Sequence, residues 1–179
     1  MRFMNTGCLH HWDEKIQEGL LTRNLDAIDQ AAGLAPEGVI HALRRVRPEF
    51  VIGAESCRAA VLHPEEDLGL SQDLRQAIAH RVAMGAQNRA LLAGYRVPDA
   101  PALRALALGE TPEDPALAAL ARHADMIAQE PARSIAQDLS ALQEVGYTVP
   151  QIIAVSELLA YVCFQIRVAH GLALMEAAQ

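Results

Sequence analysis

The chain has few aromatic residues, few cysteines and no excess of positive charge. Phe, Trp and Tyr make up 4% of its 179 residues, and the only cysteines are Cys8, Cys57 and Cys163. They are far apart and include no Cys-x-x-Cys pair, which does not suit a disulfide framework and fits a reducing compartment. The formal net charge is −7, from 15 basic and 22 acidic residues. Nucleic-acid-binding surfaces are normally basic, so we expect no nucleic-acid partner.

Long hydrophobic runs are lacking too. The longest, residues 158–164, is followed by Gln165 and Arg167 and falls short of the roughly 18 uninterrupted apolar residues of a membrane span. Near the N-terminus, Arg2 is followed by no long apolar region of the kind found in signal peptides. We therefore expect a cytoplasmic protein that does not associate with membranes.

What the chain does contain favours helices. Apolar residues make up 51% of it, with 33 alanines and 23 leucines, the best helix formers. We find no useful stretch of alternating apolar and polar residues, the pattern typical of strands. The length corresponds to one domain. We expect an all-α protein with an N-terminal extension over residues 1–22 and a single helical domain over residues 23–179.

Capping residues and apolar spacing place the helices. Ser71, Asp114 and Thr148 are suitable N-caps, and Thr148 forms a capping box with Gln151. The helix after Thr148 is apolar on most faces and should lie centrally. Pro48 should end or kink the second helix. The expected helices cover residues 25–32, 36–46, 50–62, 72–97, 115–128, 135–145 and 149–176.

Three segments carry a resemblance to a known superfamily. They are residues 70–83, residues 142–153 and residues 159–172, with further support from Asp26–Asp29, Gly33–Pro36 and residues 43–48. In order and spacing they resemble the carboxymuconolactone decarboxylase and alkyl hydroperoxidase D-like superfamily, and most closely its peroxidase-related CMD-domain branch. The resemblance covers roughly residues 24–176. It implies an alkyl hydroperoxidase D-like helical bundle, a homo-oligomer, and as a further option a related peroxidase-like partner subunit.

The redox members of that superfamily carry a Glu, then Cys-x-His-Cys, then a His. The cysteines attack and resolve the substrate, while the Glu and His move protons. The matching positions here hold Gln76, Asn88, Ala90, Leu91 and Tyr95. The resemblance therefore implies that the Cys-x-x-Cys redox site has been lost. The sequence has no phosphate loop and no Gly-rich dinucleotide fingerprint, so we expect no cofactor.

Four residues are candidates for a binding site: Arg167, Tyr95, His170 and Cys163. Cys163, Arg167 and His170 share one face of the last helix with Ser156. Cys163 and His170 are about 10 Å apart along the helix axis, too far for a thiolate–imidazolium pair. We expect Arg167 to be buried, so it needs a partner. That partner is a carboxylate from another helix, a set of backbone carbonyls, or an anionic ligand held together with Tyr95.

Other charged and metal-ligating residues are interpreted as structural. Glu55, Cys57 and His63 look like a catalytic set, but Cys57 and His63 face different ways on a helix, so we expect a small buried thiol and a loop histidine. Cys8, His10 and His11 have no fourth metal ligand at a suitable spacing. His41, His80 and His123 lie on separate predicted helices, so we expect no metal site. The basic residues Arg44, Arg45 and Arg47 should form a solvated helix end.

Two kinds of function remain open. The first is a non-redox helical oligomer that binds a small molecule or a related partner. The alternative is an enzyme: an alkyl hydroperoxidase-like, peroxiredoxin-type oxidoreductase, or a carboxymuconolactone decarboxylase-like lyase acting on a small acidic substrate. In the lyase, Arg167 would hold the carboxylate and His80 or His170 would carry a proton.

Overall fold

The computed structural model describes residues 25–87 and 89–179. Over these residues the protein is helical without strands, which confirms the all-α prediction. The extension predicted over residues 1–22, with Cys8, His10 and His11, lies outside the described residues, as does Asn88. The helices are α2 (Ala27–Ala32), α3 (Val39–Arg44), α4 (Pro48–Leu62), α5 (Gln72–Gly85), α6 (Arg89–Ala93), α7 (Pro101–Ala107), α8 (Pro115–Gln129), η1 (Pro131–Arg133), α9 (Ala136–Glu144) and α10 (Val149–Ala177).

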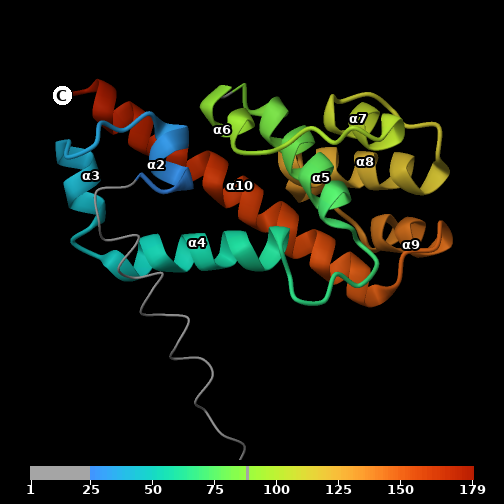
Figure 1. Ribbon diagram of the computed structural model, residues 1–179. Helices are drawn as coiled ribbons and strands as arrows, with labels where there is room; N and C mark the ends of the chain where they lie inside the picture. Colours follow the sequence, from blue (N-terminus) through green and yellow to red (C-terminus); the bar gives the residue numbers. More distant parts are fainter. Residues whose placement is uncertain (1–24, 88) are drawn as a thin grey trace, which may run out of the picture.

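The helix α10 is the longest element and crosses the whole molecule (Figure 1). It packs against α5, α2, α4 and α8, and Leu158, Leu159 and Val162 on it are completely buried. Its length and apolarity would also allow a membrane crossing, but 56% of its most apolar window is buried inside the protein. The core helix of a helical protein has the same properties, so this feature alone is weak evidence for a membrane span.

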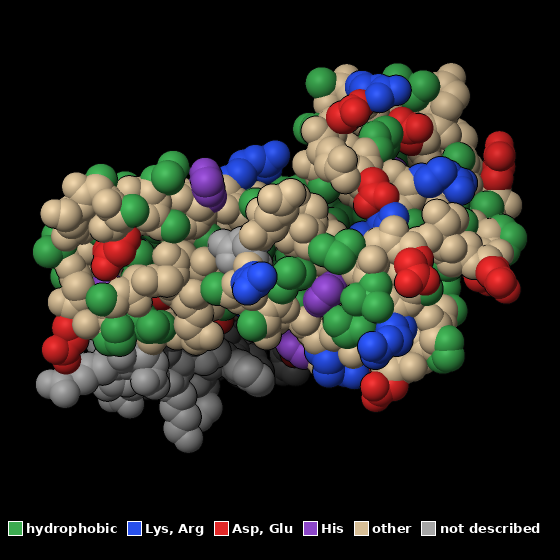
Figure 2. All heavy atoms as spheres, turned by 90° about the horizontal axis from the view of Figure 1, so that it is seen from above, with side chains coloured by type: hydrophobic (Ala, Val, Ile, Leu, Met, Phe, Trp, Pro, Cys, Tyr) green, Lys and Arg blue, Asp and Glu red, His purple; other side chains and the backbone are tan. Residues whose placement is uncertain are grey.

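A second core helix, α5, lies beside α10 and is buried at every position from Leu74 to Ala83. Different helices lie near the two ends of α10. The short helices α2 and α3 lie near the C-terminal end of α10, and α9 lies near its N-terminal end (Figure 1). On the face seen from above, acidic, basic and apolar side chains are interspersed (Figure 2).

The predicted caps are present. Ser71 Oγ accepts from the Leu74 N–H, the Asp114 carboxylate accepts from the Leu117 N–H, and Thr148 forms its capping box with Gln151. Gly33 ends α2 in the left-handed conformation, at φ +67°. These boundaries depend on contacts between near neighbours in the sequence, which is why the sequence predicts them.

Three predicted boundaries are wrong. The helix predicted from Pro36 begins at Val39, because Pro36 and Glu37 form a turn in which Glu37 has a φ of +65°. Pro48 does not end that helix but occupies the first turn of α4. The helix predicted to run to Val97 ends at Gly85, where Gln87 takes a φ of +55° and the chain turns into α6.

Candidate functional site

The predicted binding residues on α10 are divided between the core and solvent. Cys163 is buried, at 8% exposure, whereas Arg167 and His170 are exposed. The prediction of a buried Arg167 is wrong, because α2, α4, α5 and α8 pack on the other sides of α10. The Arg167 guanidinium lies beside the Cys163 thiol, but no described carboxylate forms an ion pair with it. Neither residue is hydrogen-bonded to His170, so the structure does not join the three into one site.

The buried thiol of Cys163 is poorly suited to redox attack. Burial raises the pKa of Cys163, and this effect is larger than the lowering by the nearby Arg167 guanidinium. The thiolate is the nucleophile in thiol chemistry, so a raised pKa leaves little reactive form at neutral pH. Cys57, in contrast, is exposed on α4, so the expectation of a buried thiol at this position is wrong.

We expect the two cysteines to differ sharply in reactivity. In a Cys8→Ser background, a disulfide reagent at neutral pH should modify Cys57 quickly and Cys163 on the order of a hundredfold more slowly, since a buried thiol reacts only after local opening. Absorbance of the released thiol measures both rates. Cys57→Ser should remove the fast phase and Cys163→Ser should leave it. Equally fast phases would contradict this assignment.

Tyr95 belongs to a polar cluster inside the protein and does not meet Arg167 in a pocket. Its hydroxyl donates to Gln165 Oε1, and burial raises the pKa of Tyr95 and of Tyr161. Glu55 and Arg58 of α4 lie close enough to influence both tyrosines. The buried Tyr161 hydroxyl has no hydrogen-bond partner among the described residues.

The positions that match the redox motif do not share one helix. Gln76 is buried on α5, where its Oε1 accepts from the Arg96 N–H at 3.0 Å. Ala90 is exposed and Leu91 is buried on α6. Gln76 and Leu91 therefore serve the packing of α5, α6 and the turn after α6.

Three of the other residues interpreted as structural, Glu55, His63 and His80, have hydrogen-bond partners within the fold. Glu55 accepts from the Ala27 N–H at 3.0 Å, and His63 Nδ1 is 2.7 Å from Gln72 Nε2, so neither joins Cys57 in a site. His80 Nδ1 is 3.0 Å from the Ala107 carbonyl, and burial lowers the pKa of His123. Among the described residues, no group of His, Cys, Asp or Glu could hold a metal ion.

The prediction of a solvated basic helix end is wrong for two of its three arginines. Arg44 pairs with both Asp26 and Asp29, and Arg45 Nη1 is 2.9 Å from Asp29 Oδ2. Asp29 has 0% exposure, so these pairs are withdrawn from bulk water. In the sequence, the two acidic residues three positions apart at the start of α2 are the only sign of partners for these arginines. The sequence does not show that α3 folds back onto them.

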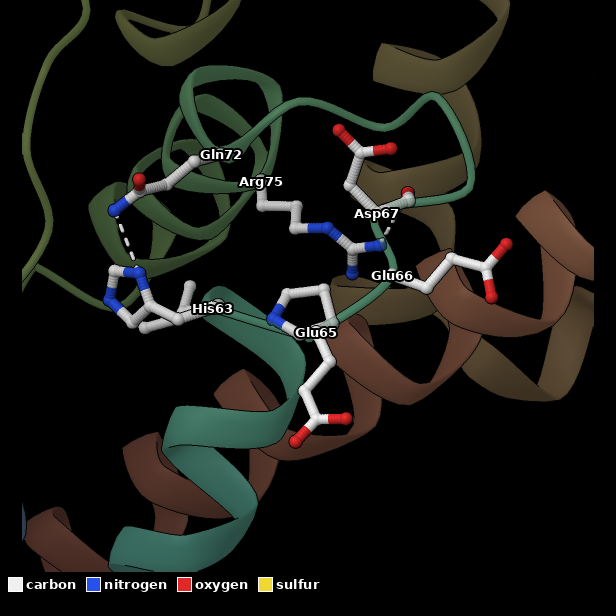
Figure 3. A pocket seen from close by; sticks show the side chains of 8 residues that line it. His63, Glu65, Glu66, Asp67, Gln72 and Arg75 are labelled. Carbon is white, nitrogen blue, oxygen red and sulfur yellow. Dashed lines mark hydrogen bonds between the residues drawn. The ribbon is translucent and has the colours of Figure 1, made fainter.

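One loop pocket is explained by a single arginine. The buried Arg75 donates to the carbonyls of Val61, Asp67 and Leu70, each at 3.0 Å, and so fixes the loop between α4 and α5. The side chains of Glu65 and Glu66 point away from the guanidinium (Figure 3). Because the Arg75 guanidinium is already bonded to backbone carbonyls, it has a structural role beside this pocket of about 500 Å³.

A different hollow has the character of a binding site. Between α4 and α10 lies an apolar groove of about 650 Å³, which we call the α4/α10 groove. Phe50 of α4 and Phe164 of α10 are exposed along it, and Tyr161 packs against Phe164 with ring centroids 6.3 Å apart. The groove is lined by Glu49, Phe50, Gly53, Ala54, Cys57, Ala60, Val61, Glu157, Ala160, Tyr161 and Phe164.

Comparisons of the chain with protein-family models, with curated proteins and with solved structures find no match. The resemblance to the carboxymuconolactone decarboxylase and alkyl hydroperoxidase D-like superfamily therefore stays a prediction. The site must be judged on its own geometry.

Proposed function

We propose that this protein binds a small, apolar molecule that carries no negative charge in the α4/α10 groove, as a homo-oligomer without thiol redox chemistry. The groove is the observation that carries the proposal. Its volume of about 650 Å³ lies within the usual range for small-molecule sites, about 300–1,000 Å³. Most of its lining is aliphatic or aromatic, with few polar groups to orient a ligand.

The polar groups of the groove favour an uncharged or cationic ligand. Its two charged side chains, Glu49 and Glu157, are both carboxylates, and among the described residues only Glu49 forms an ion pair, with Arg47. Arg167 does not line the groove, so the acidic ligand considered from the sequence has no cation there. The buried Tyr161 hydroxyl, which has no hydrogen-bond partner in the described part of the chain, would bond a ligand or water in the groove, since a buried hydroxyl without a partner is unfavourable.

The resemblance supports the same reading. It implies a family member in which Asn88 and Leu91 replace the redox cysteines, and the buried Cys163 offers no reactive thiolate in their place. Within this proposal the fold is an alkyl hydroperoxidase D-like bundle and the protein is cytoplasmic. A related peroxidase-like subunit is a further candidate partner.

N-phenyl-1-naphthylamine, an uncharged dye that fluoresces in apolar surroundings, tests the proposal. We expect saturable binding to the wild type. Ala60→Phe, which fills the groove, should weaken binding about tenfold or more, equivalent to about 1.4 kcal/mol. Ala59→Phe is the matched control, because Ala59 is exposed on the same helix but does not line the groove. Absence of binding, or equal binding by both variants, would overturn the proposed site.

A further inference from the structure

A line of exposed residues runs along α10 on the side that its neighbours leave uncovered. Its members are alternately four and three residues apart, the spacing of a coiled-coil seam. At 1.5 Å per residue the line is about 27 Å long. We call it the α10 stripe, and it consists of Ile153, Glu157, Ala160, Phe164, Arg167 and Gly171.

The charges of the stripe are complementary to those of a reversed copy. Glu157 and Arg167 lie equally far from Val162 in opposite directions along the helix. Within one helix they are about 15 Å apart and cannot pair. Between two antiparallel helices that cross at the level of Val162, each Glu157 faces the Arg167 of the other helix.

The sizes of the other members are complementary in the same register. Ala160 faces Phe164, and Ile153, which is 54% exposed, faces Gly171. A Cβ added to Gly171 would meet no atom within 4 Å, so the single chain does not require glycine there. Glycine within a helix is less stable than alanine, and here it leaves room for a large side chain from outside.

We propose that two copies of this chain pair through their α10 stripes, antiparallel, about a two-fold axis at the level of Val162. Such an interface uses the same surface of both copies. A parallel pair would instead place Glu157 against Glu157 and Arg167 against Arg167, which repel. The inference specifies the interface of the proposed homo-oligomer and rests on that part of the proposed function.

The second copy would also complete the α4/α10 groove. Glu157, Ala160 and Phe164 belong both to the stripe and to the groove lining. A partner helix on the stripe therefore covers the open side of the groove, and the partner subunit's Arg167 lies against Glu157 at its edge. The apolar ligand would then be enclosed between two subunits.

Charge reversal tests the pairing. Light scattering and sedimentation at micromolar concentration should show a dimer for the wild type. Glu157→Arg or Arg167→Glu alone places like charges together twice per dimer and should raise the dimer Kd at least about tenfold. The double variant should restore dimerisation. Arg104→Glu, on the exposed side of α7, is the control and should leave the dimer unchanged.

Gly171→Leu gives a second test that does not depend on charge. The open space around Gly171 predicts a normally folded chain by circular dichroism, but a weakened dimer because Leu collides with the partner subunit's Ile153. A monomeric wild type would overturn the dimer and the proposed oligomer. An oligomer unaffected by the single variants, or not restored by the double variant, would overturn this interface alone. Gly171 does not line the groove, so dye binding by Gly171→Leu reports whether the ligand site needs the second copy.

Discussion

Asp29→Ala is expected to lower the free energy of unfolding by about 3–5 kcal/mol, because it removes the buried carboxylate that Arg44 and Arg45 share and leaves Arg44 with Asp26 as its carboxylate partner. Asp29 is fully buried and accepts hydrogen bonds from Arg44 and Arg45, whose side chains are 12% and 15% exposed. Its Oδ2 is also 3.7 Å from His41 Nε2. The carboxylate therefore holds α3 against α2. Urea unfolding followed by circular dichroism measures the change.

Glu49→Gln is the matched control for Asp29→Ala. Glu49 also pairs with an arginine, Arg47, but both side chains are more than half exposed. Exposed pairs contribute about 0–1 kcal/mol. Similar losses in the two variants would show that the Asp29 pairs are solvated and that the α2–α3 contact does not depend on them.

The features predicted from sequence are those determined by near neighbours. The Thr148 capping box, the start of α8 at Pro115 and the Gly33 C-cap all depend on residues within one helical turn. The apolar character of α10 likewise predicts its place in the core. The alkyl hydroperoxidase D-like arrangement of these helices rests on the resemblance, which local patterns do not test.

The features missed depend on contacts between residues far apart in the chain. The α4/α10 groove brings together Phe50 and Phe164, which are far apart in the sequence, so no local pattern predicts that they lie along one groove. The prediction that Arg167 is buried is wrong, because its apolar neighbours indicate a core helix but do not indicate which side of that helix stays uncovered. Asp29 and Arg44 each look like surface residues until α3 folds back beside α2.

The end of α5 at Gly85 also depends on contacts between residues far apart in the chain. Residues 72–97 have enough helix formers for one long helix, yet the chain turns after Gly85. The turn lets Tyr95 enter the core and bond Gln165 of α10, and lets the Arg96 N–H bond Gln76. Burial of this aromatic ring and these hydrogen bonds outweigh local helix propensity, which amounts to tenths of a kcal/mol per residue.

Arg81→Met is expected to cost about 3 kcal/mol of unfolding free energy. Arg81 is buried on α5 and binds Asp125 of α8 through two hydrogen bonds of 2.7 Å. Its Nη1 also donates to the carbonyls of Leu106 and Glu110, so one guanidinium joins α5, α8 and the end of α7. The estimate lies at the lower end for a broken buried pair, because Asp125 is 39% exposed and regains some hydration.

Arg81→Lys separates the shape of this side chain from its charge. A lysine keeps the positive charge but lacks the planar fork that binds Asp125 with two atoms and reaches both carbonyls, so it should recover no more than about half of the loss. Arg96→Met, which breaks the exposed pair with Asp73, is the control and should cost at most about 1 kcal/mol. Urea unfolding of the three variants provides the comparison. If Arg81→Met loses no more than Arg96→Met, the guanidinium does not hold these three elements together, and their packing depends on apolar contacts such as Leu106 and Leu120 alone.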